Sequence, residues 1–257
     1  TYACILKACG NMGTIGKGMS IHDRIVRNGF FLRKKKNTVL GNSLVYMYAK
    51  FDMFMEARKV LIKEIPVRNV VSWSSLIAGY TQNGFGHEAL KNFRQMQSAG
   101  VCPDAVTYIS ILKACGIVGS LEIGQDIDTE VRKKGLLQKD VVLGTTLIDM
   151  YAKCGSLEKA QEVFEQLPVK NVVSWNALMV GHAQLGQANI VLSLLGKLRA
   201  EGIVPNTVTF LVSLTACSHA GLIDMGQIFF DLVGDSGLMP SLDHYTCMVD
   251  LLGRAGH

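Results

Sequence analysis

Cysteine and histidine are the residue types in this sequence that most often carry metal or catalytic chemistry, and their spacing argues against both uses. The 257 residues include seven cysteines and six histidines. No C-x-x-C or H-x-E occurs, so the signature of a zinc deaminase is missing. Cys9, Cys115 and Cys217 each follow an alanine at periodic positions, which predicts reduced, buried thiols in an intracellular protein rather than disulfides or a zinc site. We expect no cofactor, no metal site and no catalytic residue in this segment.

Short helices must position the functional side chains of this chain, as residues 141–171 illustrate. Helix breakers at Cys154-Gly155 and Pro168 leave room for two helices. The second follows Ser156, a good N-cap residue, and carries an apolar stripe at helical spacing. That stripe consists of Leu157, Ala160, Val163, Phe164 and Leu167. Because neither helix is long enough to be stable alone, both must pack on neighbours.

The same helical pair recurs along the chain in three related forms. The first two long repeats share TY-x-x-ILKACG and a matching glycine at Gly16 and Gly124, whereas the 35-residue repeats begin with VVSW and reach a Gly-Val/Ile-x-Pro turn. We predict long repeats at 1–37, 105–140 and 207–241, short repeats at 38–69 and 141–171, 35-residue repeats at 70–104 and 172–206, and a truncated short repeat at 242–257. The set of three recurs every 102–106 residues. Such repeats stack, so the predicted fold is all-α, a right-handed α-solenoid formed by a single array.

Composition permits a polyanionic partner and argues against a membrane-spanning protein. Charged residues make up 18% of the chain and the net charge is +5, so a polyanionic partner is permitted but not required. No apolar run reaches the ~18 residues of a membrane span, so we expect no membrane contact. The sequence begins at Thr1 and ends at His257 inside patterned segments, so we expect a fragment of a longer chain. The absence of a targeting signal therefore says nothing about location.

Four stretches carry a family resemblance that extends over essentially the whole chain. VVSWNALM, DMYAKCGSLEKAQEVF, ACSHAGLID and HYTCMVDLLGRAGH resemble pentatricopeptide repeats. The alternation of long (L), short (S) and 35-residue (P) motifs resembles the plant PLS subclass of that family. The resemblance implies binding of single-stranded RNA in mitochondria or chloroplasts, usually for site-specific C-to-U editing. It also implies that the full protein continues into E-type motifs and often a DYW deaminase domain.

In that family each repeat reads one base with two or three side chains, as a code. The resemblance places the readers at the fifth and the last residue of a repeat, and a valine that packs against the base at the second. The implied base-reading pairs are Asn42 with Asn69, Ser74 with Asp104, Thr145 with Asn171, and Asn176 with Asn206, with Thr246 unpaired in the truncated repeat. The implied base-stacking residues are Val39, Val71, Val142 and Val173, with Val106 and Val208 in the long repeats. Amides and hydroxyls suit this task because they donate to and accept from base edges.

The resemblance also implies a base for each pair: a pyrimidine for Asn/Asn, guanine for Ser/Asp and adenine for Thr/Asn. The long repeats depart from the pattern, because their fifth residues are apolar and cannot make a polar contact with a base. Thr1 aligns with Thr107, the third residue of its repeat, so Ala3 stands at the fifth position of the first long repeat. The fifth and last residues of the long repeats are Ala3 with Asn37, Ile109 with Asp140, and Leu211 with Ser241. We expect little or no discrimination there. The expected target of residues 38–241 is 5′-pyrimidine, G, any base, A, pyrimidine, any base-3′.

Two lysines are the candidate phosphate contacts. Lys50 and Lys153 lie eight residues after Asn42 and Thr145. Two steps of i+4 place them roughly on the same helix face as these readers. Binding through them should weaken as salt rises.

Plainer roles compete with each of these assignments. Asn, Thr or Ser early in a helix is commonly a cap or turn residue, but four pairs in register favour RNA reading. The basic tracts Arg33–Lys36 and Arg132–Lys134 could bind phosphate, and we favour solvated charges near helix ends. Trp73 and Trp175 could stack on bases, and we favour packing in the core. The same choice applies to Tyr46, Tyr48 and Tyr151.

The sequence therefore predicts a non-enzymatic, sequence-specific RNA-binding array, the recognition segment of an organellar C-to-U editing factor. Its partners would be single-stranded organellar RNA and a deaminase, in cis or in trans, or other proteins of the editing complex. One alternative is a helical-repeat scaffold that binds proteins, although the W-x₂-L-G-x₂-Y signature of tetratricopeptide repeats is missing. Another is a pentatricopeptide repeat protein that acts in RNA stabilisation or splicing without editing.

Overall fold

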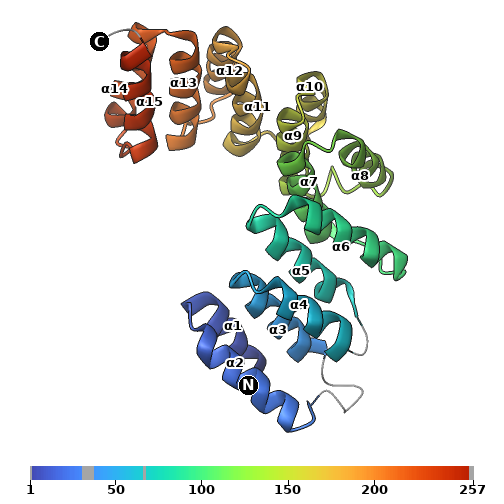
Figure 1. The fold of residues 1–257 in the computed structure, drawn as a ribbon. Helices are drawn as coiled ribbons and strands as arrows, with labels where there is room; N and C mark the ends of the chain where they lie inside the picture. The colour runs from blue at the N-terminus through green and yellow to red at the C-terminus, as the bar shows by residue number, and fades with distance from the viewer. Residues whose placement is uncertain (1, 31–37, 66–67, 255–257) are drawn as a thin grey trace. The chain divides into compact units, whose positions relative to one another are not determined.

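The computed structural model describes residues 2–30, 38–65 and 68–254, and within them every regular element is a helix (Figure 1). The α-helices are α1 (Tyr2–Met12), α2 (Ile15–Arg27), α3 (Thr38–Lys50), α4 (Phe54–Lys59), α5 (Val70–Gln82), α6 (Gly86–Ser98), α7 (Ala105–Val118), α8 (Leu121–Lys133), α9 (Val141–Lys153), α10 (Leu157–Gln166), α11 (Val172–Gln184), α12 (Ala188–Ala200), α13 (Thr207–Ala220), α14 (Ile223–Asp235) and α15 (Leu242–Arg254). One π-helical turn, η2 (Val60–Glu64), directly follows α4.

Successive first helices of the repeats stack on one another within two compact units. In the unit Thr1–Ile123, α1, α3, α5 and α7 pack in that order, and α2, α4 and α6 pack against them (Figure 1). In the unit Gly124–His257, α9, α11, α13 and α15 pack in order, with α10, α12 and α14 against them. The predicted all-α fold of stacked helix-turn-helix repeats is confirmed.

From α3 onward, the first helix of each repeat begins where the sequence places the start of that repeat. The helices α3, α5, α7, α9, α11, α13 and α15 start at residues 38, 70, 105, 141, 172, 207 and 242. Each start therefore follows the last residue of the repeat before it, which brings that last residue next to the following helix. The division of the array into long, short and 35-residue types stays a prediction.

Glycines mark the places where a second helix approaches the neighbouring repeat closely, and they correct one detail of the repeat alignment. A Cβ at Gly18 would overlap the Met47 sulfur, as a Cβ at Gly124 would overlap the sulfur of Met150. A Cβ at Gly16 would have no neighbouring atom within 4 Å. Of these three glycines, Gly18 and Gly124 lie where a side chain would block the helix contact, so Gly18, not Gly16, is the counterpart of Gly124.

The π-helical turn accommodates a difference in length between the two short repeats. Repeat 38–69 is one residue longer than repeat 141–171. In the longer repeat Ile65 packs beside Gly41, and in the shorter one Leu167 packs beside Gly144, so the helix-terminal contact is the same in both. The turn Val60–Glu64 absorbs the extra residue, as π-bulges do, and leaves the next repeat in register.

Buried tyrosine hydroxyls join each short repeat to the long repeat before it. Tyr151 Oη donates to Asp128 Oδ2 at 2.8 Å. The equivalent Tyr48 Oη lies 2.8 Å from Nδ1 of His22, whose Nε2 lies 2.8 Å from Glu64 Oε2. Burial raises the pKa of Tyr48 to about 12, so its hydroxyl stays protonated in this contact at neutral pH. The predicted core packing of these two tyrosines is confirmed, whereas Tyr46 is only half-buried.

The core also contains the tryptophans and the periodic cysteines. Trp73 and Trp175 are 4% and 2% exposed, which confirms core packing and leaves neither ring face open to a base. Cys9, Cys115 and Cys217 are buried, as predicted, and burial raises the pKa of the Cys217 thiol to about 11. None of the helices in the described ranges is long and apolar enough to cross a membrane.

Candidate nucleic-acid interface

Side-chain caps open most of the first helices, and the last residue of the preceding repeat supplies them. These residues are Asn69, Asp104, Asp140, Asn171 and Asn206. Each accepts, through Oδ1, a hydrogen bond from a backbone amide in the first turn of the helix that follows. Such a cap contributes roughly 1 kcal/mol to stability. These last residues therefore act as N-caps, and any contact that they make with a base is additional to capping.

Two of the predicted reader pairs are joined by a direct hydrogen bond between their amides. Asn42 Nδ2 donates to Asn69 Oδ1 at 3.4 Å. Asn176 Nδ2 donates to Asn206 Oδ1 at 3.1 Å. The fifth and the last residue of a repeat, 27 and 30 positions apart in sequence, thus meet at the start of the next repeat. Both side chains of each pair therefore lie together at a single place on the surface of the repeat.

The other two pairs are not joined by a hydrogen bond in the described structure. Ser74 Oγ donates to the Val71 carbonyl at 3.3 Å, and Thr145 Oγ1 donates to the Val141 carbonyl at 2.9 Å. Thr246 Oγ1 likewise donates back to the Leu242 carbonyl. A short hydroxyl side chain cannot span the gap that an asparagine spans, so it bonds to its own helix instead.

The predicted base-stacking valines share one unusual property, which is exposure. Val39, Val71, Val106, Val142, Val173 and Val208 are all second residues of their helices. Their exposed fractions run from 48% for Val71 to 67% for Val39. Scattered exposed valines need no explanation, but here the same position is left uncovered in six repeats. Each therefore offers an apolar face beside the first turn, where the reader side chains also lie.

One hollow brings a reader, a valine and a lysine together. It measures about 200 Å³ and lies on α3, α5 and the start of α7. Its lining includes the predicted reader Ser74, the valine Val106 and the predicted phosphate contact Lys50, with Tyr46 and Gln82. Three residue classes assigned separately from the sequence thus border a single cavity.

The candidate phosphate-binding lysines are held by the residue one helical turn before them. Lys153 Nζ lies 2.8 Å from Asp149 Oδ2, in an exposed i,i+4 ion pair. Lys50 Nζ lies 5.9 Å from the centre of the Tyr46 ring and donates to Gln82 Oε1 at 3.3 Å. Exposed ion pairs contribute little to stability, so a phosphate can replace the Asp149 carboxylate as partner at small cost.

Comparison with known proteins identifies the repeats. A PPR repeat family model matches residues 68–116, a PPR repeat model matches 145–172, and a pentatricopeptide repeat domain model matches 169–220. A pentatricopeptide repeat-containing protein of Arabidopsis thaliana is 40% identical over 257 residues, which are 100% of this chain and 34% of that protein. This chain belongs to the pentatricopeptide repeat family.

Other pentatricopeptide repeat proteins of Arabidopsis thaliana carry an organelle in their names. One named as chloroplastic is 39% identical over 259 residues, and one named as mitochondrial is 38% identical over 276 residues. Each covers 100% of this chain, and the chain spans about a third of the length of these relatives. Among solved structures, the pentatricopeptide repeat protein PPR10 in complex with an 18-nt psaJ RNA element is 18% identical with a TM-score of 0.39, covering 97% of this chain and 52% of that one.

The basic tract Arg132–Lys134 lies at the end of α8, a second helix, whereas the predicted readers lie at the starts of first helices. Arg132 Nε lies 2.7 Å from Asp128 Oδ1, and Lys134 Nζ lies 2.7 Å from Glu130 Oε1, so both cations are held by carboxylates on or beside α8. The tract Arg33–Lys36 lies outside the described residues, as does Asn37. Among the described fifth residues of the long repeats, Ile109 and Leu211 are half-buried and apolar.

Three side chains at these helix starts and ends were not predicted from the sequence. Arg254 ends α15 as Lys153 ends α9, and its Nε lies 3.0 Å from Asp250 Oδ1. The hydroxyls of Ser72 and Thr209 contact the amides of Asn42 and Asn176. A usable signal existed for Ser72 and Thr209, because each lies three residues after an asparagine cap, which resembles a capping box.

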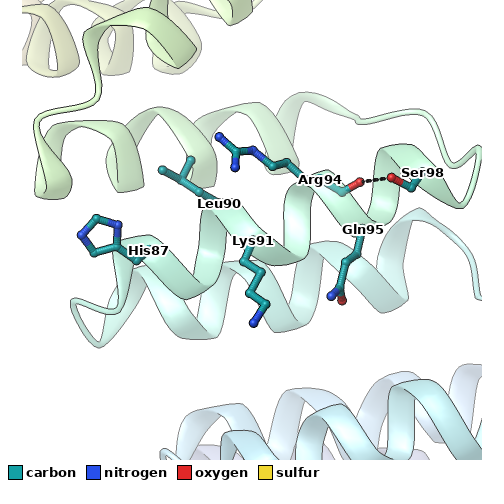
Figure 2. Close-up of a pocket in the computed structure, with 6 residues that line it drawn as sticks. All are labelled: His87, Leu90, Lys91, Arg94, Gln95 and Ser98. Carbon is teal, nitrogen blue, oxygen red and sulfur yellow. Dashed lines mark hydrogen bonds between the residues drawn. The ribbon is translucent and has the colours of Figure 1, made fainter.

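A second hollow, on α6, is unrelated to the readers. Figure 2 shows its lining along that single helix: His87, Leu90, Lys91, Arg94, Gln95 and Ser98. It measures about 420 Å³, and all of its polar side chains are exposed or partly exposed. The described part of the chain also holds no cluster of three potential metal ligands. The helix starts remain the place where the chain concentrates groups that suit a ligand.

Proposed function

We propose that this chain binds single-stranded RNA in a sequence-specific way, with one base at each short and each 35-residue repeat. The observation that carries the proposal is the meeting of fifth-residue and last-residue amides beside an exposed valine. Asn42 with Asn69 and Asn176 with Asn206 form this arrangement in different units. A base would rest on the valine and bond to the amides through its Watson–Crick edge, as single-stranded RNA readers do.

The pairs differ in the groups that they offer, and the proposed target follows from this difference. An Asn/Asn pair offers amide N–H donors, which suit the O2 oxygen that both pyrimidines carry. In the Ser74/Asp104 pair the carboxylate can accept from the N–H groups of guanine. With adenine assigned to Thr145/Asn171, the proposed target is 5′-pyrimidine, G, any base, A, pyrimidine, any base-3′. The unspecified bases fall at the long repeats, whose fifth residues are apolar.

We further propose that the chain is the recognition segment of an organellar C-to-U editing factor of the PLS subclass. The alternation of repeat types and the organelle names of similar proteins support this assignment. A deaminase, in cis or in trans, would then act on a cytidine just 3′ of the bound segment. A role in RNA stabilisation or splicing would use the same reader pairs. Conversion of the cytidine in a reconstituted system separates editing from both of these roles.

Replacing Lys50 and Lys153 should weaken the salt dependence of RNA binding and leave base preference unchanged. Each phosphate contact on a single strand adds about 0.7 to the slope of log affinity against log salt. Lys50→Gln with Lys153→Gln should therefore lower the slope by about 1.4 and leave the preferred bases unchanged. Titrations from low to moderate salt measure this.

A lysine away from the readers supplies the control for charge alone. Lys197→Gln, on the second helix of its repeat, removes an exposed cation and should change the slope little. Equal slopes for all the variants and the unaltered protein would remove the assignment of Lys50 and Lys153 to phosphate.

Binding titrations with matched and mismatched short RNAs test the proposed function directly. Matched RNA should bind more tightly, and equal affinities would contradict base reading.

A further inference from the structure

We infer that the hydroxyl groups of Ser72 and Thr209 orient the base-reading amides of Asn42 and Asn176, and so help to determine base specificity. Each hydroxyl belongs to the third residue of the following repeat and not to the repeat whose base it would influence. Ser72 and Thr209 are positioning residues in this scheme, because they act through the asparagine and do not touch the base. The inference rests on the proposed function, since it concerns the same reader pairs.

The orientation of the first pair follows from an obligatory backbone donor. The Ser72 backbone N–H bonds to Asn69 at 3.0 Å, and an N–H can only donate, so the Asn69 atom must be Oδ1. Asn42 therefore turns Nδ2 towards that oxygen, at 3.4 Å. Its Oδ1 then faces Ser72 Oγ, which donates to it at 2.6 Å. The hydroxyl closes the chain of bonds and leaves one orientation for the Asn42 amide.

The same chain of bonds recurs in the other unit with threonine in place of serine. Asn206 Oδ1 accepts from the Thr209 N–H at 3.0 Å and from Asn176 Nδ2 at 3.1 Å. A carbonyl oxygen has two lone pairs, so these two donors use its capacity. Thr209 Oγ1 lies closer to Asn176 Oδ1, at 2.8 Å, than to Asn206 Oδ1, at 3.0 Å. Its hydrogen therefore goes to Asn176.

Burial makes this orientation matter energetically. Ser72 and Thr209 have no exposed surface, and Asn176 is 5% exposed. If an amide flipped, its oxygen would face the oxygen of the last residue, and the hydrogen bond between the two amides would be lost. Asn69 is exposed and Asn42 and Asn206 are partly exposed, so we expect the larger penalty at Asn176, which is buried. With the hydroxyl in place, the fifth residue keeps Nδ2 at a defined position beside the base. Without the hydroxyl, other side-chain orientations become accessible and the preference for a pyrimidine should weaken.

Among the described repeats, the third-residue hydroxyl contacts the fifth residue of the preceding repeat only where that fifth residue is asparagine. Ser174 follows the same VVSW pattern as Ser72, but its Oγ donates to the Asn171 carbonyl at 2.8 Å, and the fifth residue here is Thr145. Thr107 Oγ1 donates to Asp104 Oδ1 at 2.6 Å, and Ser74 bonds elsewhere. Ser174 therefore keeps the capping role of Ser72 without its contact to a fifth-residue reader, which makes it a matched control.

The test compares Ser72→Ala with Ser174→Ala in RNA titrations. The RNAs carry a pyrimidine or a purine at the position of repeat 38–69 and are otherwise identical. Ser72→Ala should reduce the pyrimidine preference at that position by about threefold to tenfold, the effect of one lost hydrogen bond, and leave adenine preference at repeat 141–171 unchanged. Ser174→Ala should preserve both preferences. Ser72→Thr, which keeps the hydroxyl, should behave as the unaltered protein.

Thr209→Val tests the same inference in the unit Gly124–His257. It should weaken the pyrimidine preference only at repeat 172–206. Since each alanine variant loses one side-chain bond to a cap backbone N–H, thermal unfolding should show similar losses of stability for Ser72→Ala and Ser174→Ala. A preference that survives both Ser72→Ala and Thr209→Val, or that Ser174→Ala reduces equally, would overturn the inference. Absence of any preference in the unaltered protein would instead overturn the proposed function, and the inference with it.

Discussion

Replacing Thr145 with asparagine should change the base preference of repeat 141–171 from adenine to a pyrimidine. The Thr145 hydroxyl now bonds to the Val141 carbonyl, and its partner Asn171 caps α11. An asparagine at 145 could reach Asn171 as Asn42 reaches Asn69. Ser174 is also in place to supply the third hydroxyl. The full amide arrangement of the other pairs would then form here.

Titrations with RNAs that differ only at this position measure the change. We expect a preference of about tenfold for adenine in the unaltered protein and a comparable preference for a pyrimidine in the variant. Thr145→Ser keeps a short hydroxyl that bonds to its own helix, so it should not favour a pyrimidine. Retention of adenine preference by Thr145→Asn would show that the reader register is misassigned.

Replacing Trp175 with alanine should lower stability strongly and leave base preference unchanged. Trp175 is 2% exposed, and its ring lies 4.7 Å from the Phe164 ring in an edge-on contact. Its Nε1 has no hydrogen-bond partner in the described structure, so the contribution of this side chain is apolar packing. Loss of a buried tryptophan costs about 3–5 kcal/mol. Denaturant unfolding of the variant measures this change.

Trp175→Phe is the control, because it keeps an apolar ring in the same space and should lose less stability. Base preference of both variants is measured at a temperature at which they are folded. If Trp175 stacked on RNA instead, Trp175→Ala would unfold like the unaltered protein and bind RNA more weakly. That combination of results would contradict core packing.

Helix starts could be predicted because they depend on local sequence. Asn69, Asn171 and Asn206 are strong N-cap residues, and each is followed by a run that favours a helix. Cap chemistry fixes the first residue of the helix to within a position. Once the first residue is known, the second and fifth follow by counting. The second-residue valines are exposed and Asn42 meets Asn69 in the structure, and their part in base reading stays a prediction.

Features that depend on contacts between repeats could not be predicted. The pairing of Gly18 with Gly124 could have been found in the sequence, because these glycines lie 106 residues apart, as Thr1 and Thr107 do. The close approach of Gly18 to Met47 depends on how α2 packs. The π-helical turn Val60–Glu64 arises because Ile65 must reach Gly41 despite an extra residue, which is a tertiary constraint. The contact between the Ser72 hydroxyl and Asn42 spans 30 positions and has no local signature beyond the cap itself.

One pair of RNAs tests most directly whether this chain reads bases. The first carries 5′-pyrimidine, G, any base, A, pyrimidine, any base-3′, and the second exchanges G and A within identical flanks. Composition, length and charge are the same, so any difference in affinity reports base reading and not phosphate contacts. We expect the first RNA to bind about tenfold more tightly or better, since two positions are mismatched in the second. Equal affinities for the two RNAs would contradict the account.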